Sequence, residues 1–215
     1  MLTHHPLLAP INKRYGTWRG LVRSLLARVE LAAGRLDDFR LRQPEQVRRV
    51  VFVCQGNICR SSFAHRVALG YGLPCASIGL ATTTGGKSPA VAIAAAARAN
   101  VDMRSHRATS FTDFEVLPGD LFLVMEVRQA HAMRRRLAGR GDVHIALLGL
   151  WCRVGMPHLH DPFTLGEAYF DTVFKRIDCA VRTLSGELAH LTPWRPSPPG
   201  WRTALYSGNA RRTTG

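Results

Sequence analysis

Short apolar strands alternate with helices through the middle of the sequence. Runs of β-branched and other apolar residues predict strands over residues 50–53, 75–78, 121–125 and 143–148. Helical periodicity predicts helices over residues 61–71, 89–99, 127–138 and 166–188. This alternation predicts a three-layer α/β fold, with helices on both faces of a four-stranded parallel sheet. In such folds, ligands bind at the carboxyl ends of the strands.

The first predicted strand runs into a short loop that contains a cysteine. Cys54 is followed by five residues, then Arg60 and Ser61, where a helix is predicted to begin. Within the loop, Gly56 and Asn57 are the residue types that most easily adopt positive φ. A loop wrapped before a helix N-terminus points backbone N–H groups inward, and these bind a phosphate dianion together with the helix dipole. The segment is therefore predicted to be a phosphate-binding loop.

Three side chains of this loop suit phosphoryl transfer to sulfur. The field that binds phosphate also stabilises a thiolate, so Cys54 is expected to attack phosphorus as the thiolate. Arg60 supplies a planar fork for two phosphoryl oxygens, which a lysine could not match. Ser61 can donate a hydrogen bond to the sulfur and improve it as a leaving group. The alternative is a structural cysteine at a strand end beside a surface arginine.

The loop resembles the signature of the low-molecular-weight protein tyrosine phosphatase family. Cys-x-Gly-Asn-x-Cys-Arg-Ser directly follows the first strand, Met125-Glu126 after the third strand is similar to the bacterial branch, and residues 48–190 carry the resemblance. The family implies a phosphoric monoester hydrolase acting on phosphotyrosine, with no metal or cofactor. It further implies phosphate-binding and loop-supporting roles for Gln55, Gly56, Asn57, Ile58, Cys59, Ser61, Ser77 and His106.

Asp161 is the expected general acid. Cleavage of a phosphate ester by a thiolate needs a proton for the departing oxygen and later a base for water, and one carboxyl group can do both. Pro162 fixes an extended turn beside Asp161, in the loop after the fourth strand, and the family carries an Asp-Pro-aromatic element here. A cap of the last helix is the alternative role for Asp161. Phe163 is expected to form the substrate rim as an aromatic wall.

Two groups of cysteines and histidines have competing interpretations. Cys59 is either a small buried apolar residue or, as the resemblance favours, a redox guard that forms a disulfide with Cys54. Cys152, His158 and His160 lie near Asp161, but their spacing lacks the compact pairs of a zinc site, so no metal is expected.

Some positions depart from the family pattern. Ser62 stands where proline is usual, His65 where glutamate is usual, and Gln55 where an aliphatic residue is common. None of these changes removes a catalytic group. Relatives specific for phosphoarginine carry threonine at the position of Ile58, which disfavours that activity.

A tyrosine-phosphorylated protein is the expected substrate, and by analogy this is a bacterial tyrosine kinase of polysaccharide export. An arsenate reductase of the same fold is an alternative, but residues 76–151 contain no cysteine that could resolve its disulfide. A catalytically silent module that binds phosphate or nucleic acid is the other alternative, although no nucleic-acid partner is expected.

The positive charge lies mainly in the flanks of the chain. The formal net charge is +14; residues 1–49 carry ten Lys/Arg against four Asp/Glu, and the last 27 residues carry four Arg and no acid. We divide the chain into a basic helical extension (1–47), a phosphatase domain (48–190) and a disordered basic tail (191–215). The five cysteines are an odd number without the spacing of a disulfide framework, which favours free thiols in a reducing compartment. Since no secretory signal is recognisable either, we expect a cytoplasmic protein.

The extension contains an amphipathic helix over residues 18–33. Its apolar positions recur at helical spacing, with arginines between them. We expect these apolar residues to pack on the protein's own core; peripheral contact with an anionic membrane is the alternative.

Overall fold

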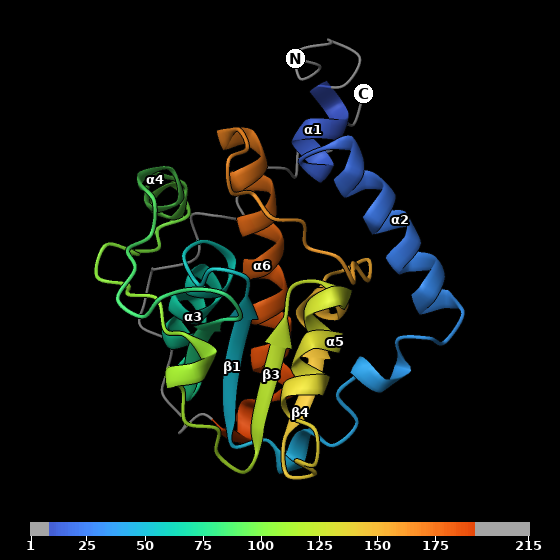
Figure 1. The fold of residues 1–215 in the computed structure, drawn as a ribbon. Coiled ribbons are helices and arrows are strands. Elements are labelled where there is room, and N and C mark those ends of the chain that lie inside the picture. The colour runs from blue at the N-terminus through green and yellow to red at the C-terminus, as the bar shows by residue number, and fades with distance from the viewer. Residues whose placement is uncertain (1–8, 192–215) are drawn as a thin grey trace, which may run out of the picture.

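A parallel sheet forms the centre of the molecule. The computed structural model describes residues 9–191 of the 215-residue chain. The strands lie in the order β2-β1-β3-β4, and every neighbouring pair is parallel (Figure 1). Their bounds are β1 (Arg49–Cys54), β2 (Cys75–Gly79), β3 (Asp120–Val124) and β4 (His144–Leu147). The predicted four-stranded parallel sheet is confirmed.

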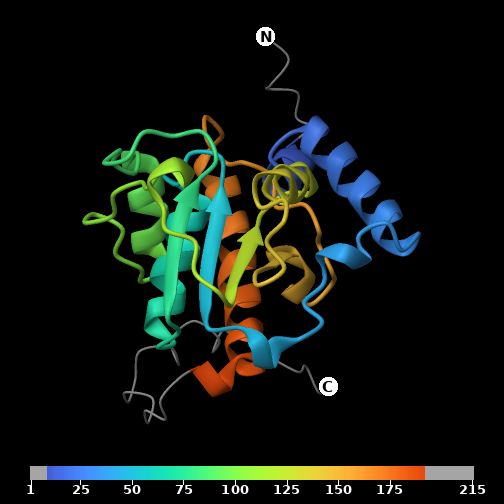
Figure 2. The ribbon, with the colours of Figure 1, turned by 60° about the horizontal axis from the view of Figure 1, so that its bottom comes forward.

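Helices cover both faces of this sheet (Figures 1 and 2). Residues of β1 alternate between two apolar clusters: Val50 and Phe52 belong to one, and Val51 and Val53 to the other. The first cluster includes residues of α3 (Arg60–Gly70), α4 (Ala90–Arg98) and α6 (Glu167–Glu187). The second includes residues of α5 (Val127–Arg136) and of the 3-10 helix Asp37–Phe39. The three layers and the four core helices agree with the prediction.

Parallel pairing brings the carboxyl ends of the strands to one edge of the sheet. Cys54, the last residue of β1, pairs in register with Gly79, the last residue of β2. Val53 pairs with Val124, so the segment after β3 begins beside the loop after β1. The segments that follow β1, β2 and β3 therefore meet at this edge, where the sequence placed the site.

The apolar core extends further toward the N-terminus than the expected domain boundary at residue 47. Leu36 and Phe39 are buried against the sheet face that α5 covers, and Val47 is buried against the opposite face. At the other end, only Leu191 of the tail predicted over 191–215 lies within the described residues, as the last residue of a 3-10 helix (Ala189–Leu191).

Two helices precede the sheet. α1 (Ala9–Tyr15) was not predicted, whereas α2 (Trp18–Ala32) matches the amphipathic helix expected over 18–33. The expectation about its packing is wrong. The face of α2 that is buried carries the small residues Gly20, Ser24 and Ala27, because these allow close approach to the domain. Of its bulky apolar residues, Trp18, Leu25, Leu26 and Val29 are exposed, and the others are half-buried. Among residues 9–191, no helix combines the length and apolarity needed to cross a membrane.

Candidate active site

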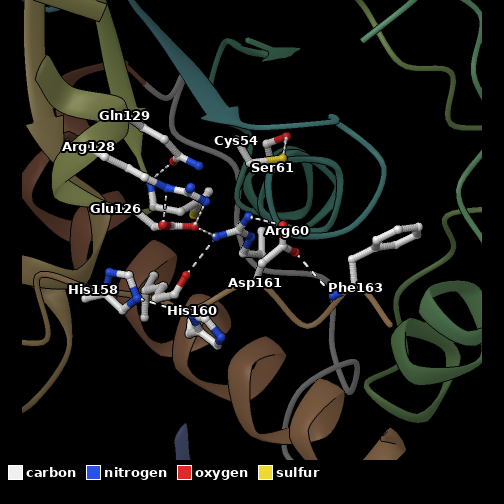
Figure 3. Close-up of polar contacts among 12 residues, drawn as sticks. Cys54, Arg60, Ser61, Glu126, Arg128, Gln129, His158, His160, Asp161 and Phe163 are labelled. Atoms are coloured by element: carbon white, nitrogen blue, oxygen red, sulfur yellow. Dashed lines mark hydrogen bonds and ion pairs between the residues drawn. The ribbon is translucent and has the colours of Figure 1, made fainter. Parts of the chain in front are cut away.

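The Cys54 sulfur lies inside the loop that connects β1 to α3. Cys54 is buried, and its Sγ accepts a hydrogen bond from the backbone N–H of Asn57 at 3.2 Å. The Ser61 hydroxyl lies 3.0 Å from the same sulfur, in the first turn of α3 (Figure 3). Donors of this kind stabilise a thiolate. The structure thus brings the predicted nucleophile and its predicted hydrogen-bond donor together.

Asn57 holds the loop in shape through three contacts. Its Nδ2 donates to Ser61 Oγ at 2.8 Å, its Oδ1 accepts from the Thr109 N–H at 2.9 Å, and its carbonyl lies 2.7 Å from His106 Nε2. Because a carbonyl only accepts, His106 Nε2 carries the proton. Burial lowers the pKa of His106, which keeps the ring neutral at pH 7. The predicted bracing roles of Asn57 and His106 agree with these contacts.

The Asn57–Ser61 contact also directs the serine proton. Since the Asn57 amide donates to Ser61 Oγ, the serine hydroxyl hydrogen is left for the Cys54 sulfur. Asn57 adopts φ of +53°, as the bend of the loop requires, whereas Gly56 does not have positive φ. The expectation that both residues bend the loop in this way holds for Asn57 alone.

Ser77 does not brace the loop directly, contrary to the expectation. Its Oγ lies 3.2 Å from His65 Nδ1, so it contacts the helix that follows the loop. The two residues after β2 support the loop through their backbone instead: the N–H groups of Leu80 and Ala81 donate to the carbonyls of Cys54 and Gln55 at 3.0 and 2.9 Å. A Cβ at Gly79 would lie only 3.1 Å from Gln55 O, which is why this close approach needs glycine.

Arg60 is almost completely buried, with 1% of its side chain exposed. Its Nη1 donates to Glu126 Oε1 at 2.5 Å and to the Leu159 carbonyl at 2.9 Å, and its Nη2 lies 2.7 Å from Asp161 Oδ2. Burial alone would lower the pKa of Arg60, but Asp161 and Glu126 raise it, so the guanidinium stays charged. Its buried Nε has no partner within the described part of the chain. This leaves a donor for an oxyanion.

Glu126 is a further residue of the candidate site, to which the sequence analysis gave no role. It lies two residues after the end of β3, as the N-cap residue of α5. Its side chain is fully buried, and its second oxygen accepts from Arg128 Nε at 2.7 Å. Burial would raise the pKa of Glu126, but the Arg60 charge and hydrogen bonds from Arg60 and Arg128 lower it to about 2. Glu126 is therefore ionised and orients Arg60. An acidic residue at the carboxyl end of a buried strand was the signal that could have found it.

Asp161 lies at the rim of the site with its carboxylate directed at Arg60 (Figure 3). One third of its side chain is exposed, and Oδ1 accepts from the backbone N–H of Phe163 at 3.2 Å. Asp161 does not cap the last helix, since α6 has Gly166 as its N-cap residue. Phe163 is 49% exposed and its ring points away from Arg60, leaving an aromatic surface open beside Asp161.

The remaining predicted loop residues differ in exposure. Gln55 is exposed and Ile58 is half-buried, so both can meet a substrate. Cys59 is buried in the core beneath the loop and precedes α3 as its N-cap residue. Burial raises the pKa of the Cys59 thiol, and the neighbouring Cys54 raises it further. Both Cys54 and Cys59 are free thiols in the structure.

The histidines before Asp161 connect the site to the N-terminal helices. His158 Nε2 lies 3.4 Å from His160 Nδ1, and His160 Nε2 lies 3.3 Å from the Thr17 hydroxyl. Burial lowers the pKa of His158 to about 4 and lowers that of His160 as well. Within residues 9–191, no three His, Cys, Asp or Glu side chains are grouped as a metal site requires. Cys152 contacts the Arg176 carbonyl instead.

The family model described as low molecular weight phosphotyrosine protein phosphatase matches residues 49–192. The chain belongs to this family. Its members are protein-tyrosine-phosphatases, which are phosphoric monoester hydrolases, so the enzyme class predicted from the sequence is confirmed. The match begins at residue 49, and α1 and α2 therefore lie outside it.

Individual relatives agree with this assignment. The chain is 29% identical over 140 residues to the probable low molecular weight protein-tyrosine-phosphatase AmsI of Erwinia amylovora, covering 63% of this chain and 94% of AmsI. It is 32% identical over 93 residues to the probable low molecular weight protein-tyrosine-phosphatase EpsP of Ralstonia nicotianae, covering 42% of this chain and 63% of EpsP.

Solved structures show the same fold. The crystal structure of Erwinia amylovora AmsI matches with a TM-score of 0.57 at 26% identity, covering 66% of this chain and 94% of AmsI. Vibrio vulnificus Wzb in complex with benzylphosphonate matches with a TM-score of 0.56 at 27% identity, covering 66% of this chain and 99% of Wzb.

Proposed function

We propose that this phosphatase hydrolyses phosphotyrosine in proteins through a phosphocysteine intermediate. The observation that carries the proposal is the geometry around the Cys54 sulfur. Sγ receives the Asn57 N–H at 3.2 Å, and the Ser61 hydroxyl lies 3.0 Å away. Arg60, at the other end of the same loop, is held 2.7 Å from the carboxylate of Asp161. The three residues to which we assign the roles of nucleophile, phosphate clamp and acid therefore lie together at one edge of the sheet.

In the first step the Cys54 thiolate attacks phosphorus while the bond from phosphorus to the tyrosine oxygen breaks. The Arg60 guanidinium and the backbone N–H groups of the loop balance the charge on the phosphoryl oxygens, which is the main contribution that a protein makes to such a transfer. Asp161 gives its proton to the departing phenolate. The product of this step is a thiophosphate ester on Cys54 and a free tyrosine side chain.

In the second step water attacks the phosphorus of the thiophosphate ester. Asp161, now ionised, accepts a proton from the water, and the sulfur–phosphorus bond breaks. The leaving sulfur regains its negative charge, which the hydroxyl proton of Ser61 stabilises. Asn57 keeps that proton directed at the sulfur because its own amide donates to Ser61 Oγ. Inorganic phosphate and the original thiolate result.

The shape of the rim supports an aromatic substrate on a protein. Phe163 exposes its ring beside Asp161, and Gln55 and Ile58 lie at the surface of the loop. A flat apolar wall suits the phenyl ring of phosphotyrosine. By the resemblance to the bacterial branch, we infer that the phosphorylated protein is a tyrosine kinase of polysaccharide export, and that the enzyme opposes it.

The deciding experiment compares wild type with Cys54→Ser on an activated aryl phosphate. Loss of the nucleophile should lower kcat by several orders of magnitude, and rapid quenching of wild type during turnover should trap phosphate on Cys54. Cys75→Ser is the matched control, because this thiol belongs to the edge strand β2, and it should retain turnover. Near-normal activity of Cys54→Ser would refute the mechanism, and binding of phosphate without turnover by wild type would indicate a silent module.

A further inference from the structure

α2 presents two different faces. On the packed face, Gly20 lies against the His160 ring, where an added Cβ would come within 2.8 Å of a ring carbon. The opposite face carries large apolar side chains: Trp18, Leu25, Leu26 and Val29 are 62%, 49%, 58% and 66% exposed. These four are half of the large hydrophobic residues that are exposed in the described part of the chain. Exposed large apolar side chains are therefore concentrated on this one helix.

The four side chains form one stripe along the helix, which we call the α2 stripe. Relative to Trp18, the other three follow at seven, eight and eleven residues, so they lie about two to three turns further along the same side of the helix. Eleven residues of helix span about 16 Å. An exposed apolar stripe of this kind on a surface helix marks an interaction site.

Positive charge surrounds the α2 stripe. Arg19 and Arg23 are exposed on α2, and neither lies within 4.0 Å of a carboxylate among residues 9–191. Lys13 and Arg14 are exposed at the end of α1, the helix that contacts α2. The only acidic residue of α2 is Glu30. A partner that binds this face must therefore offer an apolar region for the α2 stripe and negatively charged groups beside that region for the basic residues.

We propose that the α2 stripe docks on an anionic lipid bilayer, with the helix lying in the plane of the headgroups. The apolar side chains would enter the boundary of the acyl chains, and the flanking arginines would meet acidic headgroups, as in other interfacial helices. Trp18 at the start of the stripe is the residue type most enriched at that depth. A second copy of the chain fits less well, because a symmetric contact would bring the unpaired arginines of both helices together.

Docking in this way would hold the catalytic end of the sheet beside the bilayer. Figures 1 and 2 both place α1 and α2 toward the end of the molecule where the strands finish. The packed face of α2 contacts the segment that carries the acid, through the Thr17 hydroxyl and His160. The active site would then face substrates at the membrane surface.

The test measures cosedimentation of the full chain with phosphatidylcholine vesicles, with and without phosphatidylglycerol. Wild type should bind the anionic vesicles, and binding should weaken as salt is raised. Leu25→Gln/Leu26→Gln/Val29→Gln should bind at least tenfold more weakly. Glutamine is chosen because it preserves the helix. The control Leu69→Gln/Leu117→Gln/Val154→Gln changes three exposed apolar residues outside α2 and should bind like wild type. All proteins should keep their turnover on a small aryl phosphate.

Several outcomes would overturn the proposal. Equal binding by wild type and the α2 triple variant would assign vesicle binding to another part of the chain. No binding of wild type to anionic vesicles would exclude the membrane. Association of wild type into dimers in the absence of lipid, abolished by the triple variant, would assign the α2 stripe to a second copy of the chain. Arg19→Gln/Arg23→Gln gives an independent check, because it should reduce both the binding and its salt dependence.

Discussion

Replacing Glu126 with glutamine removes the charge that orients Arg60. Both side chains are buried: 0% of Glu126 and 1% of Arg60 is exposed, and Glu126 Oε1 lies 2.5 Å from Arg60 Nη1. Glutamine preserves the volume of Glu126 but replaces one carboxylate oxygen with an amide nitrogen. One oxygen of Glu126 accepts from Arg60 and the other from Arg128. In the glutamine variant, one of these arginines would therefore face an amide N–H group, which donates and cannot accept its hydrogen bond. The variant leaves the buried guanidinium without one of its two carboxylate partners, so that only Asp161 remains.

Two independent arguments give the size of the effect on stability. Removing one partner from a buried ion pair costs about 3–5 kcal/mol. The pKa of Glu126, lowered from 4.5 to about 2, corresponds to about 3 kcal/mol at pH 7. A loss of about 3 kcal/mol lowers Tm by about 6–12 °C in a domain of this size. Since the folded pKa is the lower one, this stabilisation is present above pH 4.5 and is lost as pH falls toward 2.

Thermal denaturation and steady-state kinetics together test this reasoning. Glu126→Gln should melt about 6–12 °C lower at pH 7, and the difference from wild type should shrink below pH 4.5. Turnover should fall about 100-fold, since an error of about 1 Å in a positioned group has this effect. Asp120→Asn is the matched control: Asp120 is equally buried and paired with Arg49, but lies at the start of β3, so it should lose stability without losing turnover.

Glu126→Gln with the melting temperature and turnover of wild type would refute the role of the pair. A stability difference that persisted unchanged at pH 3 would show that the carboxylate charge is not its source.

Further variants test the other groups of the site. Asp161→Ala should slow tyrosine phosphate far more than an activated phenyl phosphate, because only the poorer leaving group needs the proton; equal losses would assign the acid elsewhere. Mild peroxide should inactivate wild type reversibly with a disulfide between Cys54 and Cys59, whereas Cys59→Ser should recover poorly in reductant; full recovery would leave Cys59 a packing residue. Asn57→Ala should lower stability by about 1 kcal/mol for each lost hydrogen bond, and by about 1–2 kcal/mol for a left-handed alanine. It should also lower kcat because Ser61 loses its donor, and an unchanged Tm would contradict this reasoning.

The elements of the fold could be predicted because their causes are local. Strand residues such as Val51 and Phe52 alternate between the two faces, and helical periodicity marks the face of α6 that is buried. The Cys54–Arg60 loop is also local, since a loop before a helix N-terminus binds anions through its own backbone. The family resemblance added His106 and Asp161, which lie far from the loop in sequence.

Contacts between distant segments could not be predicted. Nothing near Arg60 in the sequence indicates that Glu126 would meet it, because that contact depends on β3 lying beside β1. Ser77 is expected to support the loop, but its hydroxyl contacts His65 of the neighbouring α3 instead. Thr17 reaches His160 across 143 residues, and only the packing of α2 on the domain creates that contact.

The strands, the helices and the loop that contains the predicted nucleophile follow from the sequence alone, because hydrophobic periodicity and turn geometry act between neighbours along the chain. The tertiary structure decided which carboxylates surround Arg60 and which face of α2 is buried. The apolar residues of α2 are its larger ones, yet Gly20, Ser24 and Ala27 form the contact. Small side chains let a helix approach a packed surface closely. Which of its faces fits depends on the shape of that surface, and the surface exists only once the domain has folded.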